Sequence, residues 1–383
     1  MMIVRLIHTS DWHLGRYFHG VHLTNDQAYV LEQFCDYVKD ARPDALVIAG
    51  DIYDRAVPPT DAVALLDDTL SKILLDYRVP TIMIAGNHDS ADRLHFGSRL
   101  LTKAGLYVYG VPSPDARPLV LSDEYGDVAF LPLVYAEPSL VRAVYGTDEV
   151  FGHEMAMRCM MDAMMPHVPK SARTVAVAHA FIAGGEECES ERPLSVGGTG
   201  SISPKLFEPF CYTALGHLHG PQKAGSDTVR YSGSLMKYSF SEAGQKKGVQ
   251  LVELAADGSV RTEMVSFTPK RDMRIVEGTF EELMRGEGSD DYIAVKLLDQ
   301  DPILDAKGRL EKKFPHLLQL ERAYFAPREM MDTTTVKRPK MTEAERFAVF
   351  FEAMTGDKMT DEQKRCLNET IDEVNETQRE VKA

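Results

Sequence analysis

Cysteine is scarce in this chain, and the few cysteines form no framework. There are five in 383 residues, an odd number, widely spaced and without a Cys-x-x-Cys pair. Disulfide-stapled scaffolds and zinc ribbons need paired or closely spaced cysteines, so the sequence argues against both classes. The same scarcity is typical of a protein that works in a reducing cytoplasm.

Long apolar runs are also missing. No stretch reaches the roughly 18 apolar residues of a membrane span. The N-terminus enters a strand-like run at residues 3–7 without the apolar core of a signal peptide. We therefore expect a soluble, unexported, cytoplasmic protein that makes no membrane contact.

Positive charge is in deficit, with a formal net charge of −15. This excludes a general nucleic-acid coat, because phosphate binding needs local positive charge. Any contact with DNA has to use metal ions, small basic patches or a partner protein. The basic pair Lys246-Lys247 is interpreted as solvated surface charge rather than as a phosphate contact.

Strand-like and helix-like segments alternate through the first two thirds of the chain. Apolar runs at 3–9, 45–49 and 79–85 predict buried strands, and the apolar spacing at 25–39 predicts a helix between the first two. A second helix is predicted from Thr60 onward. Later segments are a helix at 94–104 and strands at 106–109, 128–134, 174–178 and 212–215, with β-rich sequence at 229–267. Such alternation is typical of the α/β class.

The rest of the chain divides into shorter parts. We place the end of the first domain at residue 270, a small α/β domain at 271–330 and a Thr-, Lys- and Pro-rich linker at 331–341. Residues 342–383 are predicted to form a helical, partner-binding tail.

Two capping-box patterns, Thr342-x-x-Glu345 and Thr360-x-x-Gln363, mark the starts of two tail helices. The apolar stripes behind them are narrow and rich in Phe, which favours docking on another protein. The alternative is that the tail folds back on its own chain.

Metal-binding side chains stand at the ends of five strand-like runs. Carboxylate, imidazole and amide oxygen donors together suit manganese, iron or zinc more than calcium. Asp51 is the natural bridge, because one carboxylate can offer an oxygen to each of two ions. A pair of ions held in this way can catalyse phosphoryl displacement. The expected ligands are Asp11, His13, Asp51, Asn87, His179, His217 and His219.

The ordered set of these motifs resembles the signature of the calcineurin-like metallophosphoesterases. The resemblance covers residues 1–269 and implies a two-sheet α/β/β/α sandwich. Within that superfamily, the chain is similar to the SbcD-type bacterial nucleases. The similar stretches are 8–15, 50–59, 192–200 and 231–234.

The resemblance also implies residue roles. It assigns His88 as the proton donor or transition-state stabiliser, with Asp89 orienting His88 or supporting a neighbouring loop. Archaeal and eukaryotic relatives carry a histidine near Asp54, so the aspartate here is interpreted as a support for the ligands. Manganese is the expected metal. One ion would be held by Asp11, His13, Asp51 and His219, and the other by Asp51, Asn87, His179 and His217.

The implied function is DNA end processing in repair and recombination. The chain would act as a 3′ to 5′ exonuclease on double-stranded DNA and as an endonuclease at hairpins or blocked ends, with the small domain capping the DNA. The implied partners are an SbcC-type coiled-coil ATPase and a second copy of this chain, bound through the helices that flank residues 86–89. One alternative is a stand-alone phosphatase or cyclic-nucleotide phosphodiesterase, which would not need the part after residue 269. The other alternative is a non-enzymatic scaffold, which the complete ligand set disfavours.

Overall fold

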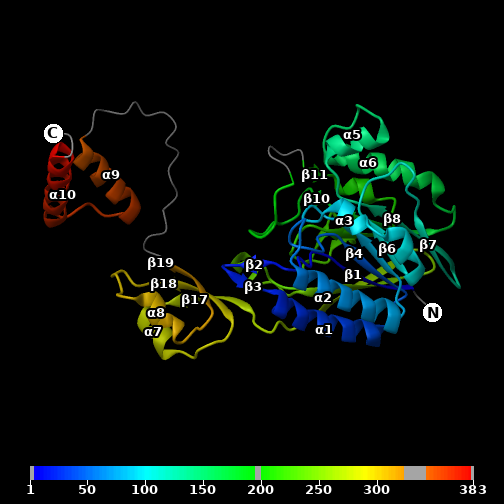
Figure 1. The fold of residues 1–383 in the computed structure, drawn as a ribbon, viewed down its shortest axis with the longest axis horizontal. Coiled ribbons are helices and arrows are strands. Elements are labelled where there is room, and N and C mark those ends of the chain that lie inside the picture. The colour runs from blue at the N-terminus through cyan, green and yellow to red at the C-terminus, as the bar shows by residue number, and fades with distance from the viewer. Residues whose placement is uncertain (1–3, 195–199, 323–341, 381–383) are drawn as a thin grey trace. The chain divides into compact units, whose positions relative to one another are not determined.

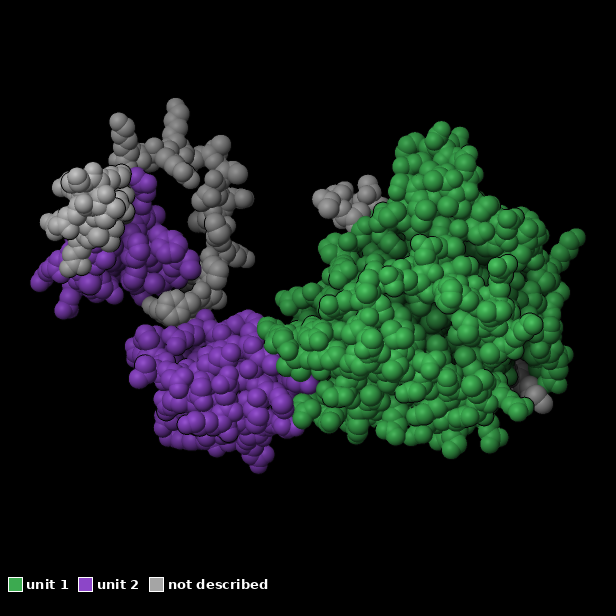
Figure 2. Space-filling model, viewed as in Figure 1, with its two compact units in different colours: residues 1–273 green, residues 274–383 purple. Residues whose placement is uncertain are grey.

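The computed structural model describes residues 4–194, 200–322 and 342–380. The chain divides into two compact units, Met1–Met273 and Arg274–Ala383, which have different colours in Figure 2. The first unit contains two large sheets, and the second contains most of a small sheet and two terminal helices.

The first sheet has six strands in the order β16-β15-β1-β4-β5-β6. β1, β4, β5 and β6 run parallel, whereas β15 pairs with β1 in the antiparallel sense. Helices α1 (Thr24–Ala41) and α2 (Thr60–Ser71) lie together on one face of this sheet (Figure 1). The strands are β1 (Val4–Thr9), β4 (Ala45–Ala49), β5 (Thr81–Ile84), β6 (Leu106–Tyr109), β15 (Gly248–Leu254) and β16 (Val260–Ser266).

The second sheet also has six strands, in the order β13-β14-β12-β9-β8-β7. Its central strands β8, β9, β12 and β14 are parallel. Helix α5 (Pro138–Tyr145) packs beside α6 (His153–Met164), and α6 packs on β8. The strands are β7 (Leu119–Asp123), β8 (Gly126–Leu133), β9 (Arg173–His179), β12 (Tyr212–Gly216), β13 (Gln222–Ala224) and β14 (Ser226–Tyr231).

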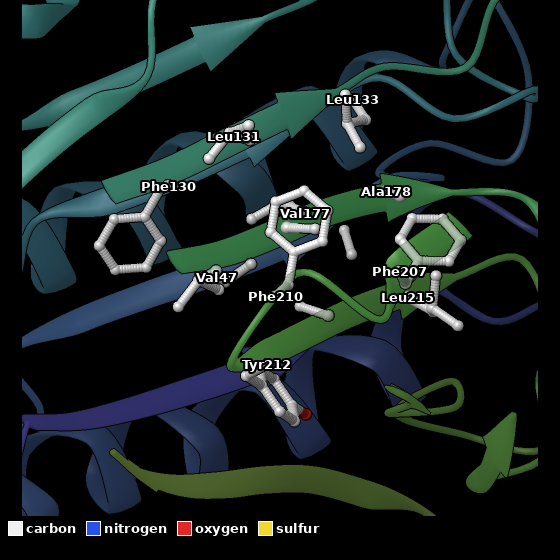
Figure 3. Close-up of a cluster of buried hydrophobic side chains, with 14 of the residues drawn as sticks. Val47, Phe130, Leu131, Leu133, Val177, Ala178, Phe207, Phe210, Tyr212 and Leu215 are labelled. Atoms are coloured by element: carbon white, nitrogen blue, oxygen red, sulfur yellow. The ribbon is translucent and has the colours of Figure 1, made fainter. Parts of the chain in front are cut away.

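The two sheets pack face to face through one apolar core. Strands β4 and β5 of the first sheet contact β9 of the second, and β4 also contacts β12. Val47 of β4 belongs to the same buried cluster as Val177 and Leu215 of the second sheet (Figure 3). Both faces of these parallel strands are covered, so the side chains on both faces are apolar. The predicted α/β sandwich is therefore confirmed.

One predicted helix differs in the structure. Residues 94–104 were expected to form a single helix, but α3 (Ala91–His95) and α4 (Ser98–Leu101) are separate. Gly97 between them has a φ of 74°, which is incompatible with a continuous right-handed helix. Short strand pairs complete the first unit: β2 (Tyr17–Phe18) with β3 (Val21–His22), and β10 (Phe181–Ile182) with β11 (Ser201–Ile202).

The second unit has its own small core. Three strands, β17 (Met273–Gly278), β18 (Tyr292–Leu297) and β19 (Leu317–Arg322), form a sheet. Helices α7 (Phe280–Arg285) and α8 (Ala306–Glu311) accompany it. The buried side chains of this core include Phe280, Ile293, Val295, Leu310 and Phe314.

The tail forms α9 (Glu343–Thr355) and α10 (Asp361–Glu380). Both predicted capping boxes are present: Thr342 exchanges hydrogen bonds with Glu345, and Thr360 does so with Gln363. The linker predicted at 331–341 lies outside the described residues.

Candidate metal centre

The predicted ligands converge at one edge of the sandwich. Loops after β1, β4 and β5 carry the ligands of the first sheet, His179 ends β9, and His217 and His219 follow β12. Parallel pairing places the carboxyl ends of these strands at the same edge of each sheet. Six of the seven predicted ligands are buried and Asn87 is half-buried.

Four of these ligands have strained backbone. The φ angles of Asp11, His13, Asp51 and His217 are 53°, 45°, 52° and 112°. Positive φ costs a non-glycine residue on the order of 1–2 kcal/mol, and such residues gather at functional sites. The strained backbone therefore lowers the stability of the fold, and it directs these four side chains toward one site.

The ligand atoms form three overlapping clusters. Within each cluster the ligand atoms lie within 4.8 Å of one another. The Asp51 Oδ2 atom lies 3.5 Å from His179 Nε2 and 3.7 Å from His13 Nε2, the position expected of a bridging carboxylate. The clusters are Asp11-His13-His219, His13-Asp51-His88 and Asp11-Asp51-His179.

A hydrogen bond behind its ring orients His179. The Nδ1 atom of His179 lies 2.9 Å from the Ala49 carbonyl oxygen, so Nδ1 carries the proton and Nε2 presents a lone pair. That Nε2 faces Asn87 Oδ1 at 2.9 Å. A neutral imidazole has one proton and cannot donate to both oxygens. Similarly, His13 Nε2 and His219 Nε2 lie 2.9 Å apart.

These facing lone pairs fit divalent cations. The buried His217 Nε2 also has no hydrogen-bond partner among the described residues, and the His217 ring lies 5.5 Å from that of His179. Imidazole nitrogens and carboxylate oxygens are the donor set of manganese, iron and zinc sites. The residues present therefore fit the predicted metal centre.

Burial controls the protonation of the site. It raises the pKa of Asp11 to about 8, an effect that His179 opposes and Asp51 reinforces. Burial also raises the pKa of Asp51 and lowers the pKa values of His13 and His217. His13 and His217 are therefore neutral donors at pH 7, whereas Asp11 and Asp51 hold protons more tightly than ordinary aspartates do, and a metal ion must displace those protons.

Manganese binding should therefore release at least about one proton per protein at pH 7. Asp11 supplies this proton, the buried Asp51 is a second source, and the neutral His13 and His217 supply none. The apparent affinity should rise as the pH increases toward the pKa of Asp11, about 8, by about tenfold per pH unit for each proton displaced. Calorimetric titrations in buffers of different ionisation enthalpy measure the released protons. An affinity that is flat or falls over this range would contradict the prediction.

Of the three remaining predicted residues, His88 belongs to one of the clusters, and Asp54 and Asp89 lie outside them. His88 donates from Nδ1 to the Asp54 carbonyl oxygen at 2.8 Å. The Asp54 carboxylate accepts from Arg16 at 3.0 Å and lies 3.8 Å from His13 Nδ1, which agrees with a supporting role. Asp89 accepts backbone N–H groups of Ile52, Tyr53 and Gly86. Of the two roles considered for Asp89, these bonds favour support of the loops.

Close backbone approach explains the glycine before Asn87. A Cβ atom on Gly86 would lie 2.1 Å from Asp51 Oδ1 and 2.4 Å from the Asp51 backbone nitrogen. Gly86→Ala should cost about 1–3 kcal/mol of stability and weaken manganese binding by displacing Asp51. Gly244→Ala is the matched control, because a Cβ there meets nothing within 4 Å. Thermal melting and manganese titration of both variants check this, and equal behaviour would contradict it.

The sequence interpretation missed the residues behind His219. Glu242 is fully buried, and the ammonium group of Lys247 lies 2.5 Å from its carboxylate. Burial alone would raise the pKa of Glu242, but the nearby His219 ring and the charge of Lys247 hold that pKa below its ordinary value. The interpretation of Lys247 as solvated charge was wrong. Gln27 of α1 was also missed, and it donates to the carbonyl oxygens of Trp12 and His13.

Two families match separate parts of the chain. The calcineurin-like phosphoesterase family matches residues 4–153. The SbcD_C family, described as the type 5 capsule protein repressor C-terminal domain, matches residues 269–355.

Two solved structures are similar over the larger part of the chain. TT1561 of Thermus thermophilus is 14% identical, with a TM-score of 0.41, and the match covers 69% of this chain and 99% of TT1561. GAP50, the anchor in the inner membrane complex of Plasmodium, is 14% identical, with a TM-score of 0.39 and coverage of 70% and 85%.

The family matches and the site agree. The phosphoesterase match contains Asp11, Asp51 and Asn87, and the structure brings the histidines of the second sheet to them. In the parts of the chain that are described, no helix is long and apolar enough to cross a membrane. A phosphoesterase domain and an SbcD-type C-terminal domain in one chain support its assignment as an SbcD-type calcineurin-like metallophosphoesterase.

Proposed function

We propose that this protein is a two-metal DNA nuclease that degrades double-stranded ends in the 3′ to 5′ direction and cuts hairpins or blocked ends. The observation that carries the proposal is the convergence of buried carboxylates and imidazoles around Asp51, in a chain with an SbcD-type C-terminal domain. Such a protein would act in DNA repair and recombination in the cytoplasm.

The predicted ligands would divide between two ions, and Asp51 would bind both. Manganese is the expected metal, and two such ions would polarise the phosphodiester and acidify the attacking water. The carboxyl groups of Asp11 and Asp51 would give up their protons to bind the ions, and the imidazoles would bind them through neutral nitrogens. One ion would be held by Asp11, His13, Asp51 and His219, and the other by Asp51, Asn87, His179 and His217.

His88 would supply the proton that the leaving oxygen needs. Its Nδ1 is fixed on the Asp54 carbonyl, so Nε2, which lies 3.9 Å from Asp51 Oδ2, is the atom that faces the substrate. Burial lowers the pKa of His88 to about 3, so the ring is neutral in the resting protein. An anionic phosphate beside Nε2 would favour the protonated form.

The direct test is manganese-dependent digestion of end-labelled duplex and hairpin DNA by the purified protein, with and without an SbcC-type ATPase. We expect shortening from 3′ ends and nicking of hairpins, both abolished by EDTA. Cyclic nucleotides and p-nitrophenyl phosphate are the comparison substrates. If the protein hydrolyses these comparison substrates and leaves the DNA uncut, it is a small-molecule phosphoesterase and not a nuclease.

The tail is proposed to bind the coiled-coil ATPase. In α9 the side chains of Phe347, Val349 and Phe350 are 45%, 57% and 58% exposed, an apolar surface that a partner helix would cover. Truncation after Lys340 should leave metal binding and weak manganese-dependent cleavage intact but abolish co-purification with the ATPase. A truncated protein that aggregates or loses its metals would show instead that the tail belongs to this chain's own fold.

A homodimer is proposed through the helices on either side of the 86–89 loop. An apolar groove of about 460 Å³ is lined by residues of α2 and the α3–α4 segment. Near this groove, Leu75, Phe96 and Leu100 are 64%, 85% and 76% exposed. Exposed apolar side chains that gather in one patch are typical of a protein–protein interface. Light scattering should give twice the chain mass of 42.8 kDa, and a monomer at micromolar concentration would contradict this proposal.

A further inference from the structure

A buried chain of hydrogen bonds stands behind His219. The Ser190 hydroxyl lies 2.7 Å from His219 Nδ1 and 2.5 Å from Glu242 Oε1. Ser190 is 8% exposed and Glu242 is fully buried. An ionised carboxylate only accepts hydrogen bonds. The Ser190 hydroxyl therefore donates to Glu242, and its oxygen accepts the proton on His219 Nδ1.

This order of donors fixes the tautomer of the ligand. With the proton held on Nδ1, the Nε2 of His219 presents a lone pair toward His13 and the metal centre. We propose that Ser190 and Glu242 form a positioning relay, which orients His219 and raises the affinity for the one ion that His219 binds. Neither residue contacts the ion in this arrangement.

The main chain of His219 is held as firmly as its ring. The Lys247 ammonium donates to the His219 carbonyl oxygen at 2.6 Å and pairs with the other Glu242 oxygen at 2.5 Å. Glu191, next to Ser190, accepts the His219 N–H at 2.6 Å. By contrast, His13 Nδ1 has no hydrogen-bond partner among the described residues. The relay is thus specific to one ligand.

The relay also depends on a loop. Ser190 and Glu191 lie between β10 and β11, and the Ser190 carbonyl oxygen accepts from Arg16 at 3.1 Å. Arg16 in turn donates to Asp54. Arg16 therefore helps to fix the segment that carries the Ser190 hydroxyl beside His219.

The test measures manganese binding without DNA. Ser190→Ala removes the relay hydroxyl, and we expect one of two manganese affinities to fall about 10- to 100-fold, the usual effect of losing a hydrogen-bond partner behind a ligand. The other affinity should not change. Ser239→Ala is the matched control, because that buried hydroxyl donates to the same Glu242 oxygen at 3.0 Å without a hydrogen bond to His219. It should bind both ions normally.

Two further variants complete the test. Ser190→Thr keeps a hydroxyl and should restore the weakened affinity. If the Ser190→Ala protein fails to fold, Glu242→Gln tests the same relay. It removes the charge that accepts the Ser190 hydrogen bond and should weaken the same manganese affinity. Equal binding by the Ser190→Ala and Ser239→Ala proteins would overturn the relay.

The inference rests on the metal centre of the proposed function, and wild-type binding separates the two. A wild-type protein that binds no manganese would overturn the proposed metal centre together with the relay. Two ions in the wild type and an unchanged Ser190→Ala variant would overturn the relay alone.

Discussion

Replacing Asp51 with asparagine should remove both metal ions and reduce phosphodiester cleavage to background. The substitution keeps the size of the side chain and an oxygen for the His88 N–H, which now donates to Oδ1 at 2.9 Å. It removes the negative charge that lies 3.5 Å from His179 and 3.7 Å from His13. Loss of both ions costs several kcal/mol of transition-state stabilisation, or about 10³-fold in rate or more.

Elemental analysis after dialysis is the measurement for Asp51. His219→Ala is the comparison, because His219 serves one ion and should weaken chiefly that one. If the Asp51→Asn and His219→Ala proteins each lose a single ion, Asp51 is not the bridge.

His88→Asn should lower cleavage by about 10²- to 10⁴-fold, the usual contribution of a general acid, while both ions stay bound. The reason is the orientation of the ring, whose Nδ1 is committed to Asp54 and whose Nε2 is left for the substrate. Because His88 also belongs to a cluster with His13 and Asp51, metal content must be measured alongside the rate.

A matched control for His88 is His316→Asn in the small domain, which should leave the rate unchanged. Near-normal cleavage by His88→Asn with full metal occupancy would remove His88 from the reaction. Loss of an ion would instead make it a ligand.

The ligands could be predicted from the sequence because each is part of a short motif. Asp11, Asp51 and Asn87 follow apolar runs directly, and parallel pairing makes the ends of such runs meet. The two capping boxes of the tail could be predicted for the same reason, because each lies within four consecutive residues.

The supports of the ligands could not be predicted. Ser190 and Glu242 are 52 positions apart and meet only because the chain folds back beside His219. Lys247 is one of two adjacent lysines, and no local pattern says which of them is buried. Gly97 splits a helix through a backbone conformation that the surrounding apolar spacing does not reveal.

The order of the ligands along the chain has a consequence for biosynthesis. The donors of the first sheet lie before residue 90, but those of the second sheet begin at His179, and β1 gains its antiparallel neighbour only at β15, Gly248–Leu254. Before His179 leaves the ribosome, the chain offers Asp11, Asp51 and Asn87 with only one of the four predicted imidazole ligands, His13. The predicted ligand set is therefore complete only once His219 has been synthesised, and the ions would join segments that emerge far apart in time.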